Sequence, residues 1–540
     1  MSVSCQSYFT FKNPCENIDK NHELFTLVTL FNIFKELYSD LFKVNDGPGC
    51  PKIYIPDIMV PFIQWGHLNK IISCRDLEKW WMRNDDTCNI VLDCKKPGKS
   101  SINECLNDYS SIIDAFDIFI VDFSLKIGLI GGKLEYHDGT ILKGYCNNFN
   151  KLYANQLYYL RDFILEHRNK TDKDGLWYKL DKYFNKNEYK DDVEPILKDL
   201  KKEIRASGIN MLKNVFTSKN GLKKVLLKIK QMEENVNGNQ PISVTDPEAH
   251  IMLDKKNKMG FNYNYQTTTD NKFGMIPSHY ITQNPNDKKE LPVIIKELYE
   301  RLDEKDFILV TDNGYWHIDS LNEIHYSPTM IIIPDNSGAK RKKDKINIQN
   351  GKIIEKSYKK HEFEKLWCLD AYLCPNDSIL TRGKNIKQNG IEYKTYSTDN
   401  CLKCSDHDKC TKQNKRILKD RDDPVLDGIK MLYESELGQE LYNGRSAYAE
   451  GNFATLLESR NFRGIKNRGT QRVNDELTLC AITHNIKKIH KHTKLNVLKT
   501  ILNLIKKEKK KHMNVSIDII DDLIEDYVFE DDVLVDLVLK

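Results

Sequence analysis

Apolar residues recur at helical spacing through the first part of the chain. The pattern covers residues 23–42, 61–68 and 74–82. We therefore expect a helical N-terminal domain over residues 1–130. Short helices across a turn are typical of a DNA-binding helix-turn-helix and of any small helical bundle, so both interpretations stand. The pair Trp80 and Trp81 is expected in the core of this domain.

The pattern changes after residue 132, where short apolar segments alternate with turn residues. Strands are predicted at residues 133–138, 307–311 and 330–334, a hairpin at 260–269 and 275–283, and a helix at 291–302. This order predicts a mixed α/β fold. Two segments interrupt it, a Lys- and Glu-rich helical stretch over residues 150–236 and a polar, cysteine-containing stretch over residues 340–423.

Two aspartates follow predicted strands. Asp138 ends the first strand, and Asp312 comes directly after the apolar segment FILVT. Ligands of α/β sheets bind beyond the carboxyl ends of strands, so both positions are candidates for a functional site. An alternative is that each aspartate only forms a turn, because each is followed by a residue that favours turns.

A third carboxylate favours the functional interpretation. Residues 446–457 are predicted to form a helix in which Ala447, Glu450, Ala454 and Leu457 share one face. We expect this face to pack on the sheet, which would bring Glu450 close to the two aspartates. A glutamate that is buried without a partner would cost free energy, so its place on this face favours a functional role over a structural one. Three converging carboxylates predict two divalent cations, Mg²⁺ or Mn²⁺, and phosphoryl transfer.

Composition narrows the class of protein. The 540 residues are 40% hydrophobic and 30% charged, with 82 Lys and Arg against 78 Asp and Glu, which excludes a disordered polyelectrolyte. No apolar run reaches the roughly 18 residues of a membrane-spanning helix. The first residues have neither the basic nor the apolar region of an export signal. We therefore expect a soluble cytoplasmic protein whose 14 cysteines are reduced.

The chain resembles the DDE transposases of prokaryotic insertion sequences. The matching segments are HDGTILKGY at 137–145, TDPEAHIM at 245–252, VTDNGYW at 310–316, YLCPND at 372–377, CLKCSDHDKC at 401–410, RSAYAEGNF at 445–453 and RGTQRVNDELTLCAITHNIKKI at 468–489. The resemblance spans most of residues 50–490 and implies a ribonuclease-H-like core, with a helical insertion after the first strand and a Cys-rich insertion before the helix of the catalytic Glu.

The resemblance also assigns roles to residues. It implies that Asp138, Asp312 and Glu450 are the catalytic acids that hold two Mg²⁺ or Mn²⁺ ions. Tyr442 and Arg445 are similar to a Tyr-Arg-Glu signature that contacts DNA ends. The chain departs from that signature, because four residues separate Arg445 from Glu450 where three are usual, and Leu457 stands where the signature has Lys.

The implied function is transposition. The enzyme would bind the terminal inverted repeats of its element as a homodimer, cut there and join the 3′ ends to target DNA, acting at the nucleoid. Two alternatives remain open: a catalytically silent, transposase-derived DNA-binding protein, and a metal-dependent nuclease with the same core. Asp246 is a rival for the first acid, but an Asp followed by Pro and Glu is typical of a helix N-terminus, so we expect it to cap a helix.

The cysteines at 374, 401, 404 and 410 have partly ligand-like spacing. Cys374, Cys401, Cys404 and Cys410 would provide the four ligands of a structural zinc ion, with His407 as a substitute, or would remain reduced thiols in a segment that packs without metal. Ten lysines between residues 487 and 512 are interleaved with apolar residues at helical spacing, which predicts either a DNA-contacting face or a solvated one. An acidic tail follows over residues 518–536 and would mask that face or form a separate extension.

These observations give the expected domain boundaries. They are 1–130 for the helical N-terminal domain, 131–149 for the first core strand, 150–243 for the helical insertion, 244–339 for the continued core, 340–432 for the Cys-containing insertion, 433–492 for the C-terminal core helices, and 493–540 for the basic helix and acidic tail.

Overall fold

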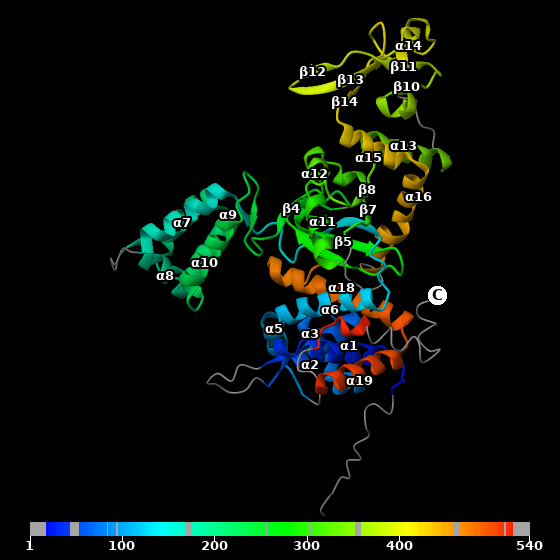
Figure 1. Ribbon diagram of the computed structural model, residues 1–540. Coiled ribbons are helices and arrows are strands. Elements are labelled where there is room, and N and C mark those ends of the chain that lie inside the picture. The colour runs from blue at the N-terminus through cyan, green and yellow to red at the C-terminus, as the bar shows by residue number, and fades with distance from the viewer. Residues whose placement is uncertain are drawn as a thin grey trace, which may run out of the picture.

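The computed structural model describes residues 18–43, 53–83, 85–92, 95–168, 175–254, 256–302, 305–350, 358–456, 464–511 and 515–521. The molecule is elongated (Figure 1), with a helical body at one end, a mixed sheet in the middle and a smaller sheet at the other end. An arm of helices projects sideways from the middle. The predicted mixed α/β class is consistent with this architecture.

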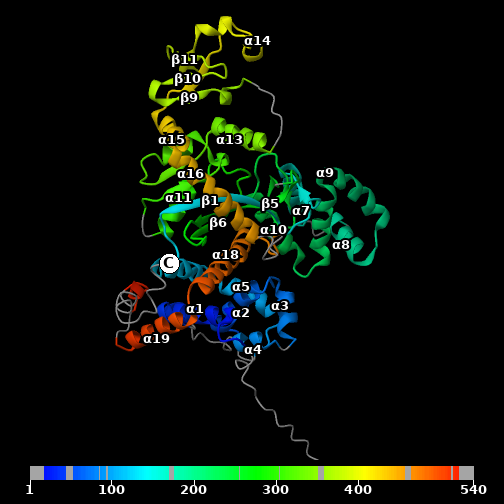
Figure 2. The ribbon, with the colours of Figure 1, turned by 90° about the vertical axis from the view of Figure 1, so that its right-hand side faces the viewer.

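The helical body combines segments from both ends of the chain. It contains α1 (Glu23–Leu37), α2 (Pro56–Leu68), α3 (Cys74–Trp81), α4 (Asp86–Leu92), α5 (Lys99–Asp108), α6 (Ser110–Lys126), α18 (Thr470–His492) and α19 (Leu495–Lys511). Its core is aromatic and aliphatic, and α18 packs along α6 beneath the central sheet (Figures 1 and 2). Trp80 and Trp81 are only partly buried, because their indole N–H groups donate to Asp85 and to the carbonyl of Pro97 near the surface.

The central sheet has the strand order β4-β5-β1-β7-β8, and β6 also pairs with β5. Its strands are β1 (Leu134–Lys143), β4 (His250–Leu253), β5 (Met259–Asp270), β6 (Ser278–Thr282), β7 (Ile308–Val310) and β8 (Met330–Ile332). The predicted hairpin is present as β5 and β6. β5 runs antiparallel to β1, whereas β7 and β8 run parallel to it.

β1 is longer than the predicted strand. It pairs with β7 only as far as Tyr136, but its pairing with β5 continues to Lys143. Asp138 therefore lies inside β1 and not at its end, so the alternative that it only forms an Asp-Gly turn is wrong. Gly139 allows a close approach at this point, since an added Cβ would lie 2.5 Å from Nε2 of Gln266 on β5.

Alternate residues of the parallel strands face opposite layers of helices. Leu309 and Ile331 join the large core that includes α6, α11 (Leu291–Arg301) and α12 (Ile318–Glu323). Tyr136, Val310 and Ile332 face the other layer. That layer contains α15 (Pro424–Glu434), α16 (Glu436–Arg445), a π-helical turn (Ser446–Glu450) and α17 (Gly451–Ala454).

Two segments extend away from the central sheet. The arm contains α7 (Ala154–Arg168), α8 (Leu176–Lys186), α9 (Lys190–Thr217) and α10 (Gly221–Glu234), with its own apolar core, and a short pair of strands, β2 (Lys151–Leu152) and β3 (Ile242–Ser243), lies at its base. The second segment begins with α13 (Asn336–Gln349) and a 3-10 turn (Lys360–Glu362). Its sheet contains β9 (Glu364–Leu366), β10 (Ala371–Leu373), β11 (Ile379–Arg382), β12 (Ile386–Gln388), β13 (Ile391–Ser397) and β14 (Leu418–Arg421).

The lysine-rich C-terminal stretch is not one continuous helix. It is divided by a break at Thr493 and Lys494. After the break α19 packs on α1, and its Leu498 and Ile505 are fully buried. Only the start of the acidic tail is described, and there Asp518 and Asp521 pair with Lys126 of α6. The rest of the tail lies outside the described residues.

Among the helices that the structure describes, none is both long enough and apolar enough to cross a membrane.

The contact between α16 and β1 generates a first prediction. A Cβ at Gly444 would lie 2.3 Å from the hydroxyl oxygen of the buried Tyr136. We expect Gly444→Ala to lower the free energy of unfolding by about 2 kcal/mol, as overpacking does. Chemical denaturation would measure this. Gly428→Ala in α15 is the matched control, because no atom lies within 4 Å of its added Cβ, and it should be neutral or slightly stabilising. Equal effects of the two changes would contradict the close contact.

Candidate functional site: three carboxylates around one guanidinium

The register of the parallel strands brings Asp138 and Asp312 together. Tyr136 pairs with Val310, and each aspartate follows two residues later. Side chains alternate along a strand, so both aspartates continue on the face of Tyr136 and Val310, which is the face that α16 covers. The two predicted aspartates therefore lie on one face of the sheet. The prediction that Asp138 ends its strand is wrong, because β1 continues to Lys143.

Arg445, the last residue of α16, lies between the carboxylates. Its Nη2 is 2.9 Å from Oδ1 of Asp138 and 3.6 Å from Oδ2 of Asp312. Its Nη1 is 3.4 Å from Oε1 of Glu450. All three predicted acids therefore contact one guanidinium. Burial opposes the positive charge of Arg445, but Asp138 and Asp312 outweigh it and raise its pKa above the usual value.

The turn that carries Glu450 is π-helical, from Ser446 to Glu450. A π-helix joins residues five apart, so Arg445 and Glu450 can lie on the same side of it. The extra residue between them, compared with the Tyr-Arg-Glu signature, is thereby accommodated. Such single π-helical turns are frequent at functional sites.

The π-helical turn also overturns part of the helix prediction. Ala447 and Glu450 are exposed, and the buried residue of this turn is Ala449. The predicted face assumed regular α-helical spacing. The π-helical turn has more residues per turn, so the side chains of this segment point in other directions than predicted. Leu457 lies outside the described residues. Glu450 therefore faces the site from solvent, with its side chain 60% exposed.

Tyr442 lies one turn before Arg445 on α16. Its ring packs edge-to-face on Tyr433, and the ammonium group of Lys342 lies 4.2 Å from its centroid. Burial raises the pKa of the Tyr442 hydroxyl to about 12, so the hydroxyl is neutral at physiological pH. The two signature residues thus lie together beside the carboxylates, with a lysine close by.

Asp312 has two roles. Its Oδ1 accepts a hydrogen bond of 2.7 Å from the backbone N–H of Gly314, and its Oδ2 faces Arg445. Asp312 therefore forms the predicted turn and also lies beside the other two carboxylates. Asp138 differs, because its side chain contacts Arg445 from within a strand.

A fourth carboxylate, Asp287, lies beside the site and was not singled out from the sequence. Its Oδ1 accepts hydrogen bonds from the side-chain amides of Asn264 and Gln266, at 2.8 and 2.7 Å. Burial raises the pKa of Asp287, and the nearby Asp312 raises it further. A signal existed in the sequence, since Asn264, Gln266 and Thr268 place polar side chains on one face of an otherwise buried strand.

Gln266 is the centre of this buried network. Its Oε1 accepts from the hydroxyl of Tyr315 at 2.5 Å and lies 2.9 Å from Nε2 of His137. Its amide nitrogen donates to Asn264 and Asp287. Burial lowers the pKa of His137 to about 3, so its ring is neutral and can donate to Gln266. The network supports β1 directly beneath Asp138.

Asp246 does not join the three acids. Its Oδ2 accepts from the hydroxyl of Tyr263 at 2.9 Å, and its Oδ1 accepts from the backbone N–H of Gly469 at 3.1 Å. The prediction of a helix beginning after Asp246 is wrong, because the next element is β4. Gly469 is instead the N-cap of α18, so Asp246 caps a helix that is distant in the sequence.

The four predicted zinc ligands border one small cavity. Cys374, Cys401, Cys404 and Cys410 line a space of about 30 Å³ together with His407. The backbone N–H of Ser378 donates to Sγ of Cys374, and the side-chain amide of Asn376 donates to Sγ of Cys404. Among the described residues, no three of these sulfur atoms lie within 4.8 Å of one another.

The charge balance around this cavity is unfavourable for free thiolates. Burial raises the pKa of the Cys410 thiol. The nearby Arg416 acts in the opposite direction, and the other three sulfurs raise the pKa further, so that it lies above the usual value. Nε2 of His407 is buried and has no hydrogen-bond partner within the described part of the chain. A cation would stabilise thiolates here and would provide a partner for the orphaned imidazole nitrogen.

The network around Gln266 generates a second prediction. Gln266→Leu should lower the free energy of unfolding by about 3 kcal/mol, because it leaves several buried polar groups without partners. Tyr315→Phe is the matched control. It removes only one hydrogen bond to the same oxygen, so a loss of about 1 kcal/mol is expected. Denaturant titration would measure both values, and similar losses would show that Gln266 does not hold the network together.

Comparison with known proteins adds one finding. A family model described as "Transposase DDE domain" matches residues 373–490. The matched segment contains Tyr442, Arg445 and Glu450, whereas Asp138 and Asp312 lie before it. No curated protein and no solved structure matches the chain. Over residues 373–490 the chain is therefore similar to the DDE domain of transposases, a family whose members in general use divalent metal ions to cleave and join DNA.

Proposed function

We propose that the chain is a DNA transposase that binds the terminal inverted repeats of its own element, cuts DNA there and joins the 3′ ends to target DNA. One observation carries the proposal: Asp138, Asp312 and Glu450 all contact the guanidinium of Arg445. Arg445 and Glu450 lie in the segment that matches the transposase DDE domain, whereas Asp138 lies in β1 and Asp312 follows its parallel neighbour β7.

The sheet supports a ribonuclease-H-like core for the same proposal. Three strands, β6, β5 and β1, are antiparallel neighbours, and β7 and β8 extend the sheet in parallel with β1. Asp138 lies in β1, and Asp312 follows β7, the parallel neighbour of β1. The helix with the third acid covers the same face of the sheet.

The donor set fits hard divalent cations. Carboxylate oxygens are preferred ligands of Mg²⁺ and Mn²⁺, and Asp138, Asp312 and Glu450 would hold two such ions. When bound, these ions would lower the pKa of an attacking water or 3′-hydroxyl and stabilise the departing oxygen of the phosphodiester. Arg445 now neutralises the acids. With cations present, its guanidinium would be free to bind a DNA phosphate.

Tyr442 and Arg445 would position the DNA end. They lie one turn apart on α16, beside the acids, and Lys342 adds a positive charge at Tyr442. The network around Gln266 would keep β1 and the turn after Asp312 in a fixed relation, since Tyr315 belongs to that turn. Each residue here binds or orients the substrate, and no covalent protein intermediate is required.

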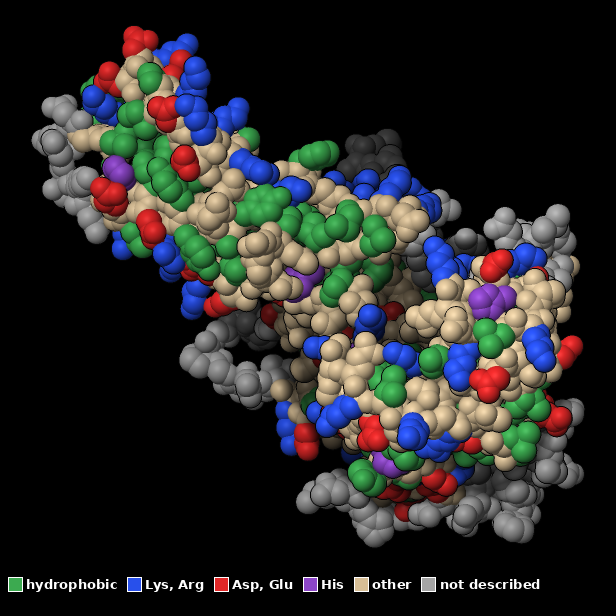
Figure 3. Space-filling view, turned by 90° about the horizontal axis from the view of Figure 1, so that it is seen from above, with side chains coloured by type: hydrophobic (Ala, Val, Ile, Leu, Met, Phe, Trp, Pro, Cys, Tyr) green, Lys and Arg blue, Asp and Glu red, His purple; other side chains and the backbone are tan. Residues whose placement is uncertain are grey.

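DNA binding would use Lys and Arg side chains that lie outside the carboxylate cluster. On the face seen in Figure 3, Lys and Arg side chains are interspersed with Asp and Glu. The basic face of α19 would add sequence-independent phosphate contacts. Cutting two ends together requires at least a homodimer. The helical N-terminal body would provide recognition of the repeats.

Cleavage of DNA from the ends of the element in Mg²⁺ tests the catalytic assignment. Asp138→Asn, Asp312→Asn and Glu450→Gln should each abolish cutting, because each removes a cation ligand. Asp246→Asn is the control and should lower the melting temperature, yet leave cutting by the folded fraction intact. Loss of cutting in folded Asp246→Asn, with cutting retained in Asp138→Asn, would reverse the assignment.

A pre-cut substrate separates the two rival functions. DNA with a free 3′-hydroxyl at the element end should be joined to target DNA by the wild-type chain. Cutting without joining would instead indicate a metal-dependent nuclease. Binding to the ends without either reaction would indicate a silent, transposase-derived DNA-binding protein.

The proposal extends to a structural zinc ion at Cys374, Cys401, Cys404 and Cys410. Thiolates bind zinc at about 2.3 Å, and N–H groups that donate to sulfur stabilise such ligands. The orphaned Nε2 of His407 is a further donor at the same cavity. The ion would hold the Cys-containing segment together and would take no part in cleavage.

Zinc content provides the corresponding test. Mass spectrometry of the native protein should find about one zinc per chain, which Cys404→Ser should remove. Cys368→Ser is the control, because this exposed cysteine of the same segment lies outside the cavity. A metal-free wild-type chain, or full zinc content in Cys404→Ser, would leave the cysteines as reduced thiols.

A further inference from the structure

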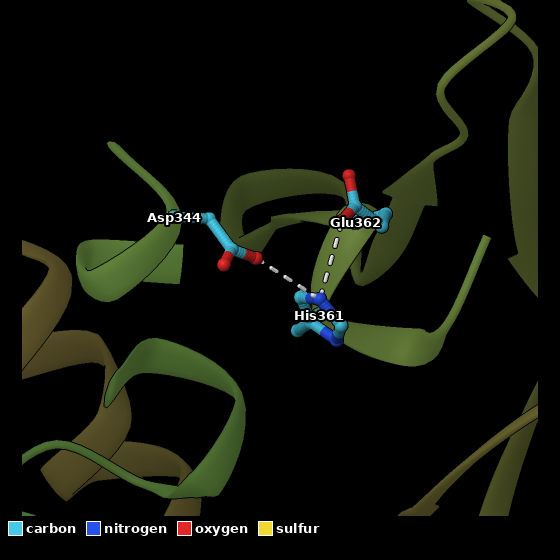
Figure 4. Close-up of side chains that lie close together, drawn as sticks. All are labelled: Asp344, His361 and Glu362. Carbon is cyan, nitrogen blue, oxygen red and sulfur yellow. Dashed lines mark ion pairs between the residues drawn. The ribbon is translucent and has the colours of Figure 1, made fainter. Parts of the chain in front are cut away.

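A second group of potential metal ligands lies where the Cys-containing segment begins. Nε2 of His361 is 3.3 Å from Oδ2 of Asp344 and 3.1 Å from Oε1 of Glu362. Figure 4 shows both carboxylates directed at the same ring nitrogen. Asp344 is on α13, and the other two residues are in the 3-10 turn at 360–362. Among the described residues, this is the only group whose three ligand atoms lie within 4.8 Å of one another.

The neighbouring cations are engaged elsewhere. Arg341 pairs with Glu434, Lys360 with Asp420, and Lys342 donates to Asn443. Lys365, which also borders this region, pairs with Asp370. Within the described part of the chain, neither Asp344 nor Glu362 has a Lys or Arg partner. The imidazole of His361 is therefore the shared ion-pair partner of both carboxylates in the described part of the chain.

Burial makes this arrangement unfavourable without a further charge. The side chain of His361 is 7% exposed, and those of Asp344 and Glu362 are 24% and 27% exposed. A neutral imidazole leaves a net charge of −2, and a protonated one leaves −1. A divalent cation bound to the neutral imidazole brings the group to zero, which removes the cost of a partly buried net charge.

The donor atoms indicate the class of cation. One imidazole nitrogen and two carboxylate oxygens suit first-row divalent metals, whereas Mg²⁺ and Ca²⁺ prefer oxygen alone. When two metal–ligand bonds of about 2.1 Å meet at a right angle, the two ligand atoms are about 3 Å apart. The distances from Nε2 of His361 to the oxygens of Asp344 and Glu362, 3.3 and 3.1 Å, are close to this value. All three residues also line a groove of about 800 Å³, which leaves the remaining coordination positions open to water.

We propose that Asp344, His361 and Glu362 bind one first-row divalent cation of the Mn²⁺ type, separate from the three acids around Arg445. The ion joins α13 to the turn that leads into the Cys-containing sheet. Two other residues of α13, Arg341 and Lys342, contact α15 and α16 through Glu434 and Asn443. The cation would therefore stabilise the packing of α13 on α15 and on α16, the helix that ends at Arg445. This site is independent of the proposed transposase function.

Mn²⁺ binding to the full chain, followed by electron paramagnetic resonance, tests the proposal. The signal of an Mn²⁺ ion bound by imidazole carries a ¹⁴N modulation, which an all-carboxylate site does not give. We expect this modulation in the wild type and in Asp138→Asn, and its loss in His361→Ala. Glu362→Gln, a nearly isosteric change, should keep the fold and weaken Mn²⁺ binding about tenfold or more.

His407→Ala is the matched control, because it removes the histidine beside the cysteines and should leave the modulation unchanged. Circular dichroism would establish that His361→Ala is folded. Absence of the modulation in the wild type, or its persistence in folded His361→Ala, would overturn the proposal and leave an ion-pair cluster. A chain that shows the modulation but cuts no DNA would contradict the transposase proposal alone.

Discussion

The packing of α16 against β1 is the contact on which the rest of the site depends. It is close because Gly444 lies directly over the ring of Tyr136, whose hydroxyl donates to the carbonyl of Leu441. Tyr448 then stacks on the same ring at 5.0 Å. This contact fixes where α16 ends, and so it brings the guanidinium of Arg445 among carboxylates from three separate parts of the chain.

The acids of the site are neutralised by Arg445, and the buried polar groups on the strands below it are paired by Gln266. Arg445 neutralises acids that would otherwise repel one another across the face of the sheet. On the strands themselves, Gln266 satisfies the polar groups of His137 and Tyr315 and helps to hold Asp287. A buried network of this kind is stabilising only when every member is paired. The position of the carboxylates therefore depends on a hydrogen-bond network that forms in one geometry only.

The second candidate cation site has a different composition and a different place in the fold. It combines imidazole with carboxylates at the junction between α13 and the Cys-containing segment, and it lines the groove beside α15 and α16. The cysteines form a third cluster farther along the same segment. The potential donor atoms thus differ from one cluster to the next: oxygen only, mixed nitrogen and oxygen, and mostly sulfur. Each set of donors favours a different class of metal.

Hydrophobic periodicity predicted the mixed α/β class, the hairpin of β5 and β6, the strand that contains Asp138 and the strand that precedes Asp312, because it reflects which face of an element is buried. The pattern also indicated Glu450, through a regular helical spacing that a π-helical turn replaces, whereas only the family resemblance indicated Arg445. The π-helical turn, the capping of α18 by Asp246 and the contact of Asp344 with His361 were not predicted and are known only from the three-dimensional structure. Each of these depends on contacts between residues that local periodicity does not relate, so no pattern along the chain could specify them.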